Sequence, residues 1–339
     1  MESLAVRYRP KDWEEVCSQN SIIKILSRQV ELREFSNCFL FCGPSGCGKT
    51  TVARIFANKI NNNAGNAIEI DAASNNGVDK IRDIVSTANQ RSVDSEYKVL
   101  ILDEAHTLTN QSWQALLKVI EETPKYTIFI FCTTDPQKIP ATIVNRCQRF
   151  NFNRIPTEII ANRLRYICEQ EGFKNYSETI SYIAKTSNGQ MRDSIASLEK
   201  VASYNPNDLN IETAISVLGN YSYDTYFSIF NAVIDLKYDE IFKIIDDMYN
   251  SGGDIKIFVD QYLVFCLDIM KYIIFKNCDI LQIPQSMEDK IKMSINFDNA
   301  DKYLAYIIDK VLSLKNMLKT DTNPKDTVEA IFLQMSRAE

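Results

Sequence analysis

Short apolar runs alternate with segments of helical spacing in the first part of the chain. The runs are typical of buried strands, and they lie at 37–42, 67–72, 97–104 and 127–134. Helical spacing follows the first three runs, at 50–60, 78–90 and 111–122. Strands that alternate with helices of about 10–15 residues predict a parallel sheet covered by helices. Because the pattern stops near Pro156, we expect an α/β domain at 1–156.

The remainder of the chain is predicted to be helical. Residues 157–219 indicate three or four short helices, with breaks near Gly172, Gly189 and Pro206. Further on, apolar residues three and four apart predict longer helices at 222–236, 238–250, 254–276 and 298–319. We therefore expect two more domains, a small helical domain at 157–219 and an all-helical domain at 220–339. Three domains suit 339 residues at about 150 residues per domain.

Acidic charge is concentrated in the last part of the chain. The net charge is −6, from 38 basic and 44 acidic residues. Residues 221–339 hold 13 basic and 19 acidic residues, whereas the first 220 are balanced at 25 of each. This distribution argues against a protein that coats nucleic acid non-specifically. Any contact with DNA is expected in the first part.

Cysteine and histidine usage argues against a zinc site. The nine cysteines form no C-x-x-C pair, and His106 is the single histidine. Most of the cysteines lie in apolar or small-residue runs, as buried free thiols do in a reducing cytosol. The N-terminus lacks the apolar segment of a secretion signal, so a cytoplasmic location is expected. The apolar stretch 257–275 carries Asp260, Asp268 and Lys271, which favours a buried amphipathic helix over a membrane span.

A phosphate-binding motif follows the first predicted strand. Residues 43–50 read GPSGCGKT and match the P-loop (Walker A) pattern, which predicts a nucleotide site formed by Gly43, Pro44, Ser45, Gly46, Cys47, Gly48, Lys49, Thr50 and the adjoining Thr51. The glycines let backbone N–H groups surround phosphate oxygens at the start of a helix. Lys49 is expected to reach the β- and γ-phosphates of ATP, and Thr50 to bind Mg²⁺. The alternative is a glycine-rich turn that matches by accident.

Two carboxylates end the third predicted strand. Asp103 follows four apolar residues and is expected to reach Mg²⁺ at the carboxyl end of the sheet. Glu104 is placed to orient and deprotonate water, which favours hydrolysis over transfer to a second substrate. Many strands end in acidic residues, so this signal depends on the P-loop that precedes it. His106 completes a D-E-A-H string, where a histidine is more often structural than catalytic.

Several further motifs occur in the order of one known family. They are RYRP at 7–10, IDAAS at 70–74, LLKVIEE at 116–122, TTDPQK at 133–138, NRC at 145–147 and GQMRD at 189–193. With the P-loop, they make the chain resemble AAA+ ATPases, and more closely the gamma/tau ATPase subunit of the bacterial DNA polymerase III clamp loader. The resemblance covers residues 1–219 well, and the rest only by helical character and length.

This resemblance implies roles for four more residues. Thr134 would be the first sensor beside the γ-phosphate, and Arg192 the second sensor, reaching from the helical lid to the nucleotide of its own subunit. Arg146 would be an arginine finger that completes a neighbouring subunit's site. Arg7 and the segment to Pro10 would lie against the adenine. Each of the first three roles has a purely structural alternative. Thr134 would be a strand-end threonine without a ligand, Arg146 a surface arginine, and Arg192 a partner in a salt bridge near Asp193.

The chain departs from the family pattern in three places. The four-cysteine zinc module that bacterial members carry before the second strand is missing, because only residues 61–66 occupy that space. Asn145 replaces the usual serine before Arg146. The sequence ends with the third domain, without an extension for helicase or polymerase. A compact form without zinc resembles a phage-encoded version.

Contact with DNA is expected on the helix after the second strand. The resemblance implies that this helix faces duplex phosphates, and here it offers Lys80 and Arg82. Asn75 and Gly77 stand where the family has basic residues, so amides and backbone N–H groups would meet part of the backbone. The alternative is a solvated helix face.

We therefore expect an ATPase subunit of a sliding-clamp loader. The resemblance implies ATP and Mg²⁺, a sliding clamp, primer–template DNA and other loader subunits in a ring, which would be pentameric, joined by the helical collar at 220–339. No zinc and no membrane are expected. Two alternatives stay open: an ATP-driven DNA translocase or helicase, and a structural loader subunit that does not hydrolyse ATP. Unwinding without a clamp would indicate the first, and an ATPase assay decides the second.

Overall fold

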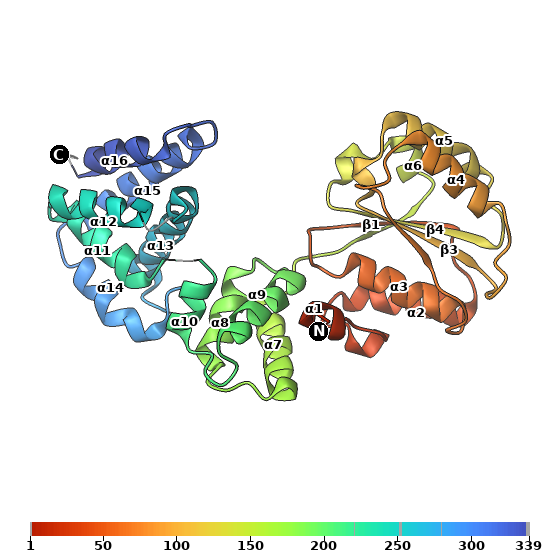
Figure 1. Ribbon diagram of the computed structural model, residues 1–339, viewed down its shortest axis with the longest axis horizontal. Helices are drawn as coiled ribbons and strands as arrows, with labels where there is room; N and C mark the ends of the chain where they lie inside the picture. The colour runs from red at the N-terminus through yellow and green to blue at the C-terminus, as the bar shows by residue number, and fades with distance from the viewer. Residues whose placement is uncertain (1, 220, 251–252, 279, 337–339) are drawn as a thin grey trace. The chain divides into compact units, whose positions relative to one another are not determined.

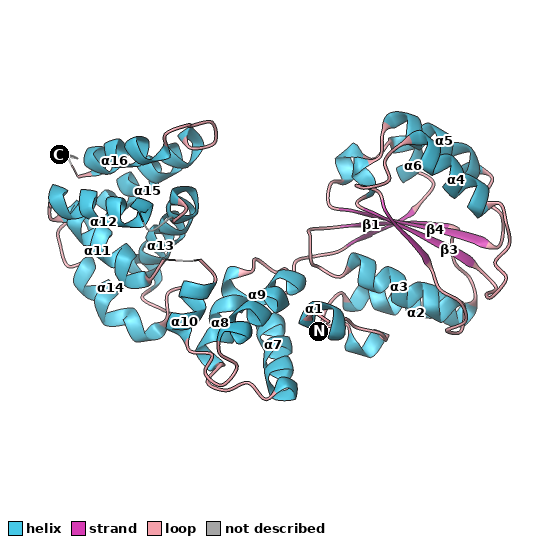
Figure 2. Ribbon diagram, viewed as in Figure 1, coloured by secondary structure: helices cyan, strands magenta, loops and turns pink. Residues whose placement is uncertain are grey.

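The computed structural model describes residues 2–219, 221–250, 253–278 and 280–336. These residues form two compact units. The first contains the described residues of 1–171 together with 183–199, and the second contains 172–182 together with those from 200 onwards. All the strands of the described residues lie in the first unit, and the second unit is helical (Figure 2).

A five-stranded parallel sheet forms the centre of the first unit. Its strands are β1 (Cys38–Cys42), β2 (Ile68–Asp71), β3 (Lys98–Asp103), β4 (Thr127–Thr133) and β5 (Gln148–Asn151). They are ordered β2-β3-β4-β1-β5, with parallel pairing throughout. The predicted parallel α/β sheet is therefore confirmed. The short edge strand β5 was not among the predicted strands.

Helices cover both faces of this sheet (Figure 1). One face carries α2 (Asn20–Leu32) and α3 (Lys49–Ile60), and the other carries α4 (Val78–Ala88), α5 (Asn110–Glu121) and α6 (Ala141–Val144). Side chains along β1 point alternately to the two faces of the sheet. Phe39 and Phe41 belong to the core under α2 and α3, and Leu40 belongs to the core under α4 and α5. A strand buried on both faces reads as a continuous apolar run, which is why β1, β3 and β4 were predictable.

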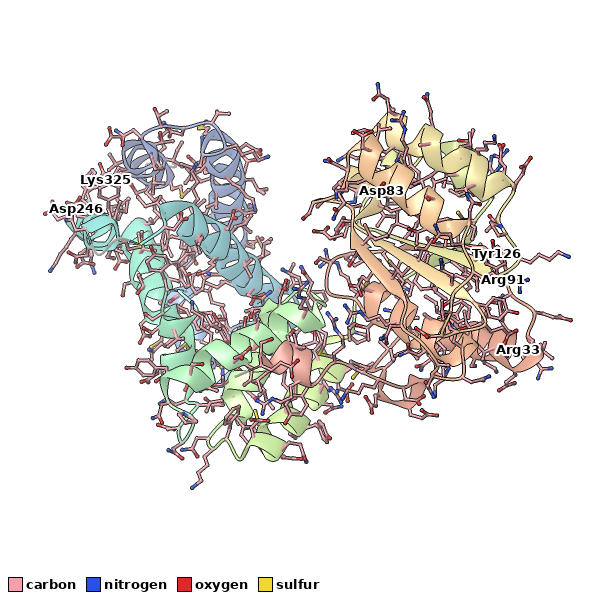
Figure 3. All side chains as sticks on the ribbon, turned by 45° about the vertical axis from the view of Figure 1, so that its right-hand side comes forward. Arg33, Asp83, Arg91, Tyr126, Asp246 and Lys325 are labelled. Carbon is pink, nitrogen blue, oxygen red and sulfur yellow. The ribbon has the colours of Figure 1, made fainter. Side chains whose placement is uncertain are left out.

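Further elements precede, join or follow the strands of this unit. They are α1 (Leu4–Arg7), η1 (Trp13–Glu15), η2 (Ala105–Thr107), η3 (Pro136–Lys138) and, after the sheet, α7 (Thr157–Glu171). Exposed side chains pair across the surface: the Arg91 guanidinium lies over the Tyr126 ring, 5.3 Å from its centroid (Figure 3). Arg33 donates to the Ile60 carbonyl and pairs with Glu96 at 2.7 Å, which ties the end of α2 to the end of α3.

Four helices occupy the region between 157 and 219, in agreement with the prediction of three or four. After α7 they are α8 (Ser177–Thr186), α9 (Met191–Tyr204) and α10 (Ile211–Val217). Gly172 and Gly189, at two of the predicted breaks, both have positive φ, at 72° and 79°. A left-handed residue ends a helix, and glycine adopts that conformation without a Cβ penalty.

The second unit packs its helices around aromatic side chains. It contains α11 (Tyr223–Ile234), α12 (Tyr238–Asn250), α13 (Ile255–Phe275), η4 (Gln285–Met287), α14 (Glu288–Ser294), α15 (Ala300–Met317) and α16 (Pro324–Met335). Tyr262, Phe265 and Phe332 are fully or almost fully buried at its centre. At its surface Lys325 of α16 pairs with Asp246 of α12 at 2.5 Å (Figure 3). The helices α14 and α16 were not predicted.

The apolar helix α13 is held in this unit by a buried carboxylate. Asp268 is 0% exposed and accepts backbone N–H groups of Gln282 and Ile283 at 2.5 and 3.2 Å. Lys271 donates to its other oxygen at 2.8 Å. Asp268, one of the charged residues that argued against a membrane span, thus stabilises a turn that packs on α13. Within the described residues, no helix combines the length and the apolar character that crossing a bilayer requires.

Candidate active site

The loop between β1 and α3 is shaped by three glycines of positive φ. Gly43, Gly46 and Gly48 have φ of 155°, 66° and 102°. A Cβ on Gly43 would lie 2.5 Å from the carbonyl oxygen of Phe152, so the loop passes too close to the segment after β5 for any side chain. Helix α3 begins at Lys49, directly after Gly48. A tight glycine turn that opens a helix presents backbone N–H groups to an anion, and it is the local structure that the motif predicted.

Lys49 lies inside this loop. Its side chain is buried, and its ammonium donates to the carbonyl oxygens of Gly43 and Pro44, each at 2.9 Å. A buried ammonium requires anionic or polar partners, and here both partners are backbone dipoles rather than a carboxylate. The loop therefore holds a full positive charge that is available to a phosphate.

Thr50 and Asp103 bring two oxygen donors together. The Thr50 hydroxyl donates to Asp103 Oδ2 at 2.7 Å. One comes from the start of α3 and the other from the end of β3, so the sheet fixes their separation. Hydroxyl and carboxylate oxygens are ligands that Mg²⁺ prefers, and Mg²⁺ keeps several waters when few protein ligands are present. This donor set fits a nucleotide-bound magnesium ion.

Glu104 follows Asp103 in an unusual backbone conformation. Its φ and ψ are 48° and 42°, in the left-handed region that non-glycine residues rarely occupy. Its Oε2 accepts a hydrogen bond from Thr134 Oγ1 at 3.2 Å and lies 3.3 Å from His106 Nδ1. Thr134 directly follows β4, the strand beside β3. The carboxyl ends of β3 and β4 thus bring the expected base and first sensor into contact.

A pocket of about 970 Å³, including the space open to solvent, connects these groups. Three parts of the first unit line the pocket: the N-terminal segment, the phosphate loop with the acidic strand end, and the helices after the sheet. The lining residues are Ala5, 8–10, 16–19, 45–51, Asp103, Glu104, Ile155, Arg163, Met191, Arg192 and Ile195.

The start of α9 is joined to the phosphate loop by backbone contact. The Met191 N–H donates to the Gly46 carbonyl at 3.1 Å. A Cβ on Gly46 would lie 3.0 Å from the Gln190 side chain, so the two segments approach closely. Arg192 is the next residue and lines the pocket, as its expected role requires.

The N-terminal segment reaches the pocket through Arg9 rather than Arg7. Arg7 pairs with Glu171 at 3.0 Å, shares that carboxylate with the Tyr8 hydroxyl, and is absent from the pocket lining. Arg9 lines the pocket, and its pKa is lowered, chiefly by burial and by the charge of Arg54 and further by Arg192, while Glu69 and Asp103 act in the opposite direction. Three arginines line this one pocket, namely Arg9, Arg163 and Arg192, and their positive charge favours an anionic ligand.

Arg146 lies outside its own chain's pocket. It follows α6, and it donates to Glu121 Oε1 at 2.6 Å and to the Thr142 carbonyl at 2.7 Å. Both side chains of the ion pair are well exposed, at 38% for Arg146 and 42% for Glu121. Ion pairs of that exposure contribute about 0–1 kcal/mol, so the guanidinium is not committed to this partner.

The comparisons with known proteins agree with the motifs. A family model described as "DNA polymerase III, delta subunit" matches residues 66–156. A DNA polymerase III subunit gamma/tau of Mycoplasma genitalium is 31% identical over 96% of this chain and 58% of its own length. A DNA polymerase III subunit tau of Bacillus subtilis is 33% identical over 78% of this chain and 51% of its own.

The chain is a relative of the bacterial DNA polymerase III gamma/tau subunits. The resemblance predicted from the sequence is therefore confirmed. The chain spans between about a third and two thirds of the length of the curated relatives it matches: a gamma subunit of Buchnera aphidicola, 34% identical over 64% of this chain, is covered to 65%, and a tau/gamma subunit of Haemophilus influenzae to 36%. These relatives are bacterial, so they give no support to the phage origin suggested above.

A solved structure supports the fold alone. The RuvB Holliday junction branch migration motor of Thermotoga maritima superposes with a TM-score of 0.53 over 76% of this chain and 91% of that chain, at 17% identity. The parallel sheet with the P-loop after β1 is thus the AAA+ ATPase architecture, followed here by a helical region. The predicted fold class is confirmed.

The residues expected to contact DNA lie away from the pocket. Lys80 and Arg82 are exposed on α4, and neither lines the pocket. Arg82 pairs with Asp79 one turn earlier at 3.0 Å, and Lys80 borders a shallow depression with Asp71 and Asp83. Acidic neighbours weaken the attraction of this helix for phosphates. The expectation of DNA contact at α4 therefore depends on the gamma/tau resemblance, because the charge of this helix gives it little support.

Among the charged residues that line the pocket, sequence reasoning missed Arg163, whereas Tyr8 and Arg9 belong to the segment up to Pro10 that was expected there. The quoted RYRP segment already contains Tyr8 and Arg9, but the sequence does not show which of its arginines turns inward. The structure answers this through Arg163 of α7, which donates to the Tyr8 carbonyl at 2.8 Å and lines the pocket itself. No local signal marks Arg163, because its role depends on packing between segments about 155 residues apart.

For metals other than magnesium, the structure offers no evident site. All nine cysteines are free, and within the described part of the chain no group of three or more His, Cys, Asp or Glu side chains is placed to hold a metal ion. Burial raises the pKa of the Cys168 thiol to about 12, so this cysteine stays protonated and inert at neutral pH.

Proposed function

We propose that this chain is an ATP-hydrolysing subunit of a sliding-clamp loader. The observation that carries the proposal is one pocket in which a P-loop lysine, a magnesium-type oxygen pair and a strand-end glutamate meet, in a relative of the gamma/tau subunits. ATP would be the substrate and Mg²⁺ the cofactor, with no zinc. A bacterial cytoplasmic location follows from this proposal.

The phosphate loop would bind the nucleotide through residues 43–51. Lys49 would exchange its two carbonyl partners for oxygens of the β- and γ-phosphates. Thr50 and Asp103 would hold Mg²⁺, which when bound neutralises charge that develops on the phosphates. Tyr8, Arg9 and Pro10 would border the base and sugar, in place of the expected Arg7.

Hydrolysis would depend on Glu104 as the base that accepts a proton from water. Thr134 would act as first sensor, since its hydroxyl already contacts the Glu104 carboxylate. Arg192 would act as second sensor, and the backbone hydrogen bond from the preceding Met191 to Gly46 of the phosphate loop supports this role. Each of these groups sits at a strand or helix end, where the sheet or α9 fixes its position.

Arg146 would act in trans on the nucleotide of a neighbouring subunit. Its exposure, its distance from its own pocket and its weak ion pair with Glu121 support this role. The other partners would be a sliding clamp, primer–template DNA met by Lys80 and Arg82, and further loader subunits in a pentameric ring. In this proposal 1–156 is the ATPase domain, 157–219 the lid and 220–339 the collar that joins subunits.

The test measures ATP turnover with primed DNA and with the clamp of the same organism, each alone and together. A loader shows synergy, because hydrolysis is completed only when both partners are bound. Turnover that responds to DNA alone, with unwinding of a forked duplex in the absence of a clamp, would indicate a translocase instead. ATP binding without turnover under every condition would indicate a structural subunit.

A further inference from the structure

His106 contacts the carboxylate of Glu104 from the turn that follows it. The two residues are linked by Nδ1 of the imidazole and Oε2 of the carboxylate, 3.3 Å apart. Thr133 Oγ1, at the end of β4, lies 3.3 Å from the same Nδ1. His106 therefore sits between the ends of β3 and β4, with its side chain 17% exposed. The chain's single histidine is placed where the expected base is held.

Hydrogen-bond chemistry limits how the imidazole can interact with these neighbours. A carboxylate oxygen can only accept, so a hydrogen bond between His106 and Glu104 is donated by an N–H at Nδ1. The Thr133 hydroxyl oxygen accepts from the Asp135 N–H at 3.1 Å and keeps a second lone pair. An N–H at Nδ1 is therefore compatible with both neighbours, each 3.3 Å away.

The backbone fixes the spacing of the two side chains. Glu104 is left-handed, and η2 turns the chain so that the residue two positions on faces back toward it. Thr107 secures the turn, since its N–H and hydroxyl both donate to the Glu104 carbonyl, at 3.0 and 2.8 Å. A left-handed non-glycine residue is strained, and such strain tends to mark functional positions. The turn therefore holds His106 against Glu104.

Both described contacts of the Glu104 carboxylate fall on one oxygen. Thr134 Oγ1 and His106 Nδ1 each approach Oε2. With Oε2 fixed from two sides, rotation of the carboxylate is restricted, and Oε1 remains the oxygen to receive a proton. A base contributes most when its geometry is set before the reaction.

We propose that His106 is a positioning residue for hydrolysis, which orients Glu104 by donating from Nδ1 to Oε2. The inference rests on the proposed role of Glu104 as base. His106 does not touch the nucleotide in this proposal, so its loss affects turnover and leaves nucleotide affinity unchanged.

The test compares three replacements of His106 in the full chain, assayed with primed DNA and clamp. Asparagine can place an amide N–H near the position of Nδ1, glutamine places one near Nε2, and alanine places none. We expect H106A and H106Q to lower kcat about tenfold with KM for ATP unchanged, since a tenfold loss corresponds to about 1.4 kcal/mol. H106N should recover kcat to within about threefold.

Thermal unfolding of the three variants separates positioning from folding. If kcat follows the melting temperature, or if H106N is as slow as H106A while equally well folded, the histidine is structural and the proposal is wrong. Wild-type kcat in H106A and H106Q would overturn it as well.

A double-mutant comparison distinguishes failure of the positioning role of His106 from failure of the proposed function. In an E104Q background, H106A should cause no further loss, because there is no base left to orient. If E104Q itself keeps wild-type turnover, the role of Glu104 as base is wrong, and that of His106 with it. If E104Q is inactive but H106A is normal, only the positioning role is wrong.

Discussion

Lys49 carries the only ammonium group among the residues that line the described pocket. Its two partners are carbonyl dipoles of the loop, so replacement leaves no carboxylate unpaired and should not unfold the chain. Lys49→Ala is expected to weaken ATP binding by roughly 100-fold, about 2.7 kcal/mol, because a buried charge that meets phosphate is removed. Titration calorimetry with ATP and Mg²⁺ measures the change.

The matched control is Lys24→Ala, which removes an exposed lysine of α2. Its affinity for ATP should equal that of the wild type. An affinity of Lys49→Ala within a few-fold of the wild type would contradict the assignment of residues 43–51 as the phosphate loop.

Residue roles were predictable where a motif fixes position along the chain. The sequence placed Lys49, Thr50, Asp103 and Glu104 in one site, and the structure brings these four together. The sequence did not show that Arg9, and not Arg7, lines the pocket. Arg7 instead pairs with Glu171, which lies 164 positions later. Such a contact depends on how α7 packs against the N-terminal segment, and no local pattern encodes it.

At the scale of elements, the loop between β1 and α3 depends on a close approach to the segment after β5. Gly43→Ala would bring a Cβ within 2.5 Å of the Phe152 carbonyl oxygen, and backbone atoms cannot yield as a flexible side chain does. We expect a loss of about 2–4 kcal/mol in the free energy of unfolding, together with weaker ATP binding. Chemical denaturation followed by fluorescence measures it.

Gly77→Ala is the corresponding control, because nothing lies within 4 Å of a Cβ there and φ is −74°. We expect its stability to stay within about 1 kcal/mol of the wild type. Equal effects of the two alanines would show that the contact between Gly43 and Phe152 does not limit the fold.

Burial made three of the strands predictable from the sequence. The strands β1, β3 and β4 are buried along almost their whole length and read as apolar runs. Edge strand β5 reads Gln-Arg-Phe-Asn and buries mainly Phe150, so its sequence carries no such signal and only pairing with β1 defines it. The seven-residue helix α14 was missed for a similar reason, since it spans only about two turns and offers little periodicity.

At the scale of the whole molecule, the proposed trans role of Arg146 predicts complementation between inactive chains. Arg146→Ala should leave ATP binding by the isolated chain unchanged and lower turnover of the assembled loader at least 100-fold, about 2.7 kcal/mol. Mixed with Lys49→Ala, which binds ATP much more weakly but still provides Arg146, it should regain part of the clamp- and DNA-stimulated turnover. Steady-state ATPase assays of each variant and of mixtures measure this.

The mixture requires proof that both variants share one assembly, which differently tagged chains provide. If co-purified mixtures stay as inactive as the separate variants, Arg146 does not act across subunits. It would then be a surface arginine whose partner is Glu121.

The left-handed backbone at Glu104 has a consequence for how this protein can change during evolution. Glycine adopts that conformation without steric cost, so Glu104→Gly should relieve about 1 kcal/mol of strain while it removes the base. We expect an inactive protein whose melting temperature equals or exceeds that of the wild type. Gln114→Gly, at an exposed position in the right-handed helix α5, should instead lower stability by about 1 kcal/mol. Selection for stability alone would therefore favour loss of the glutamate, so its retention against the preference of the backbone is what the proposed role of Glu104 in turnover predicts.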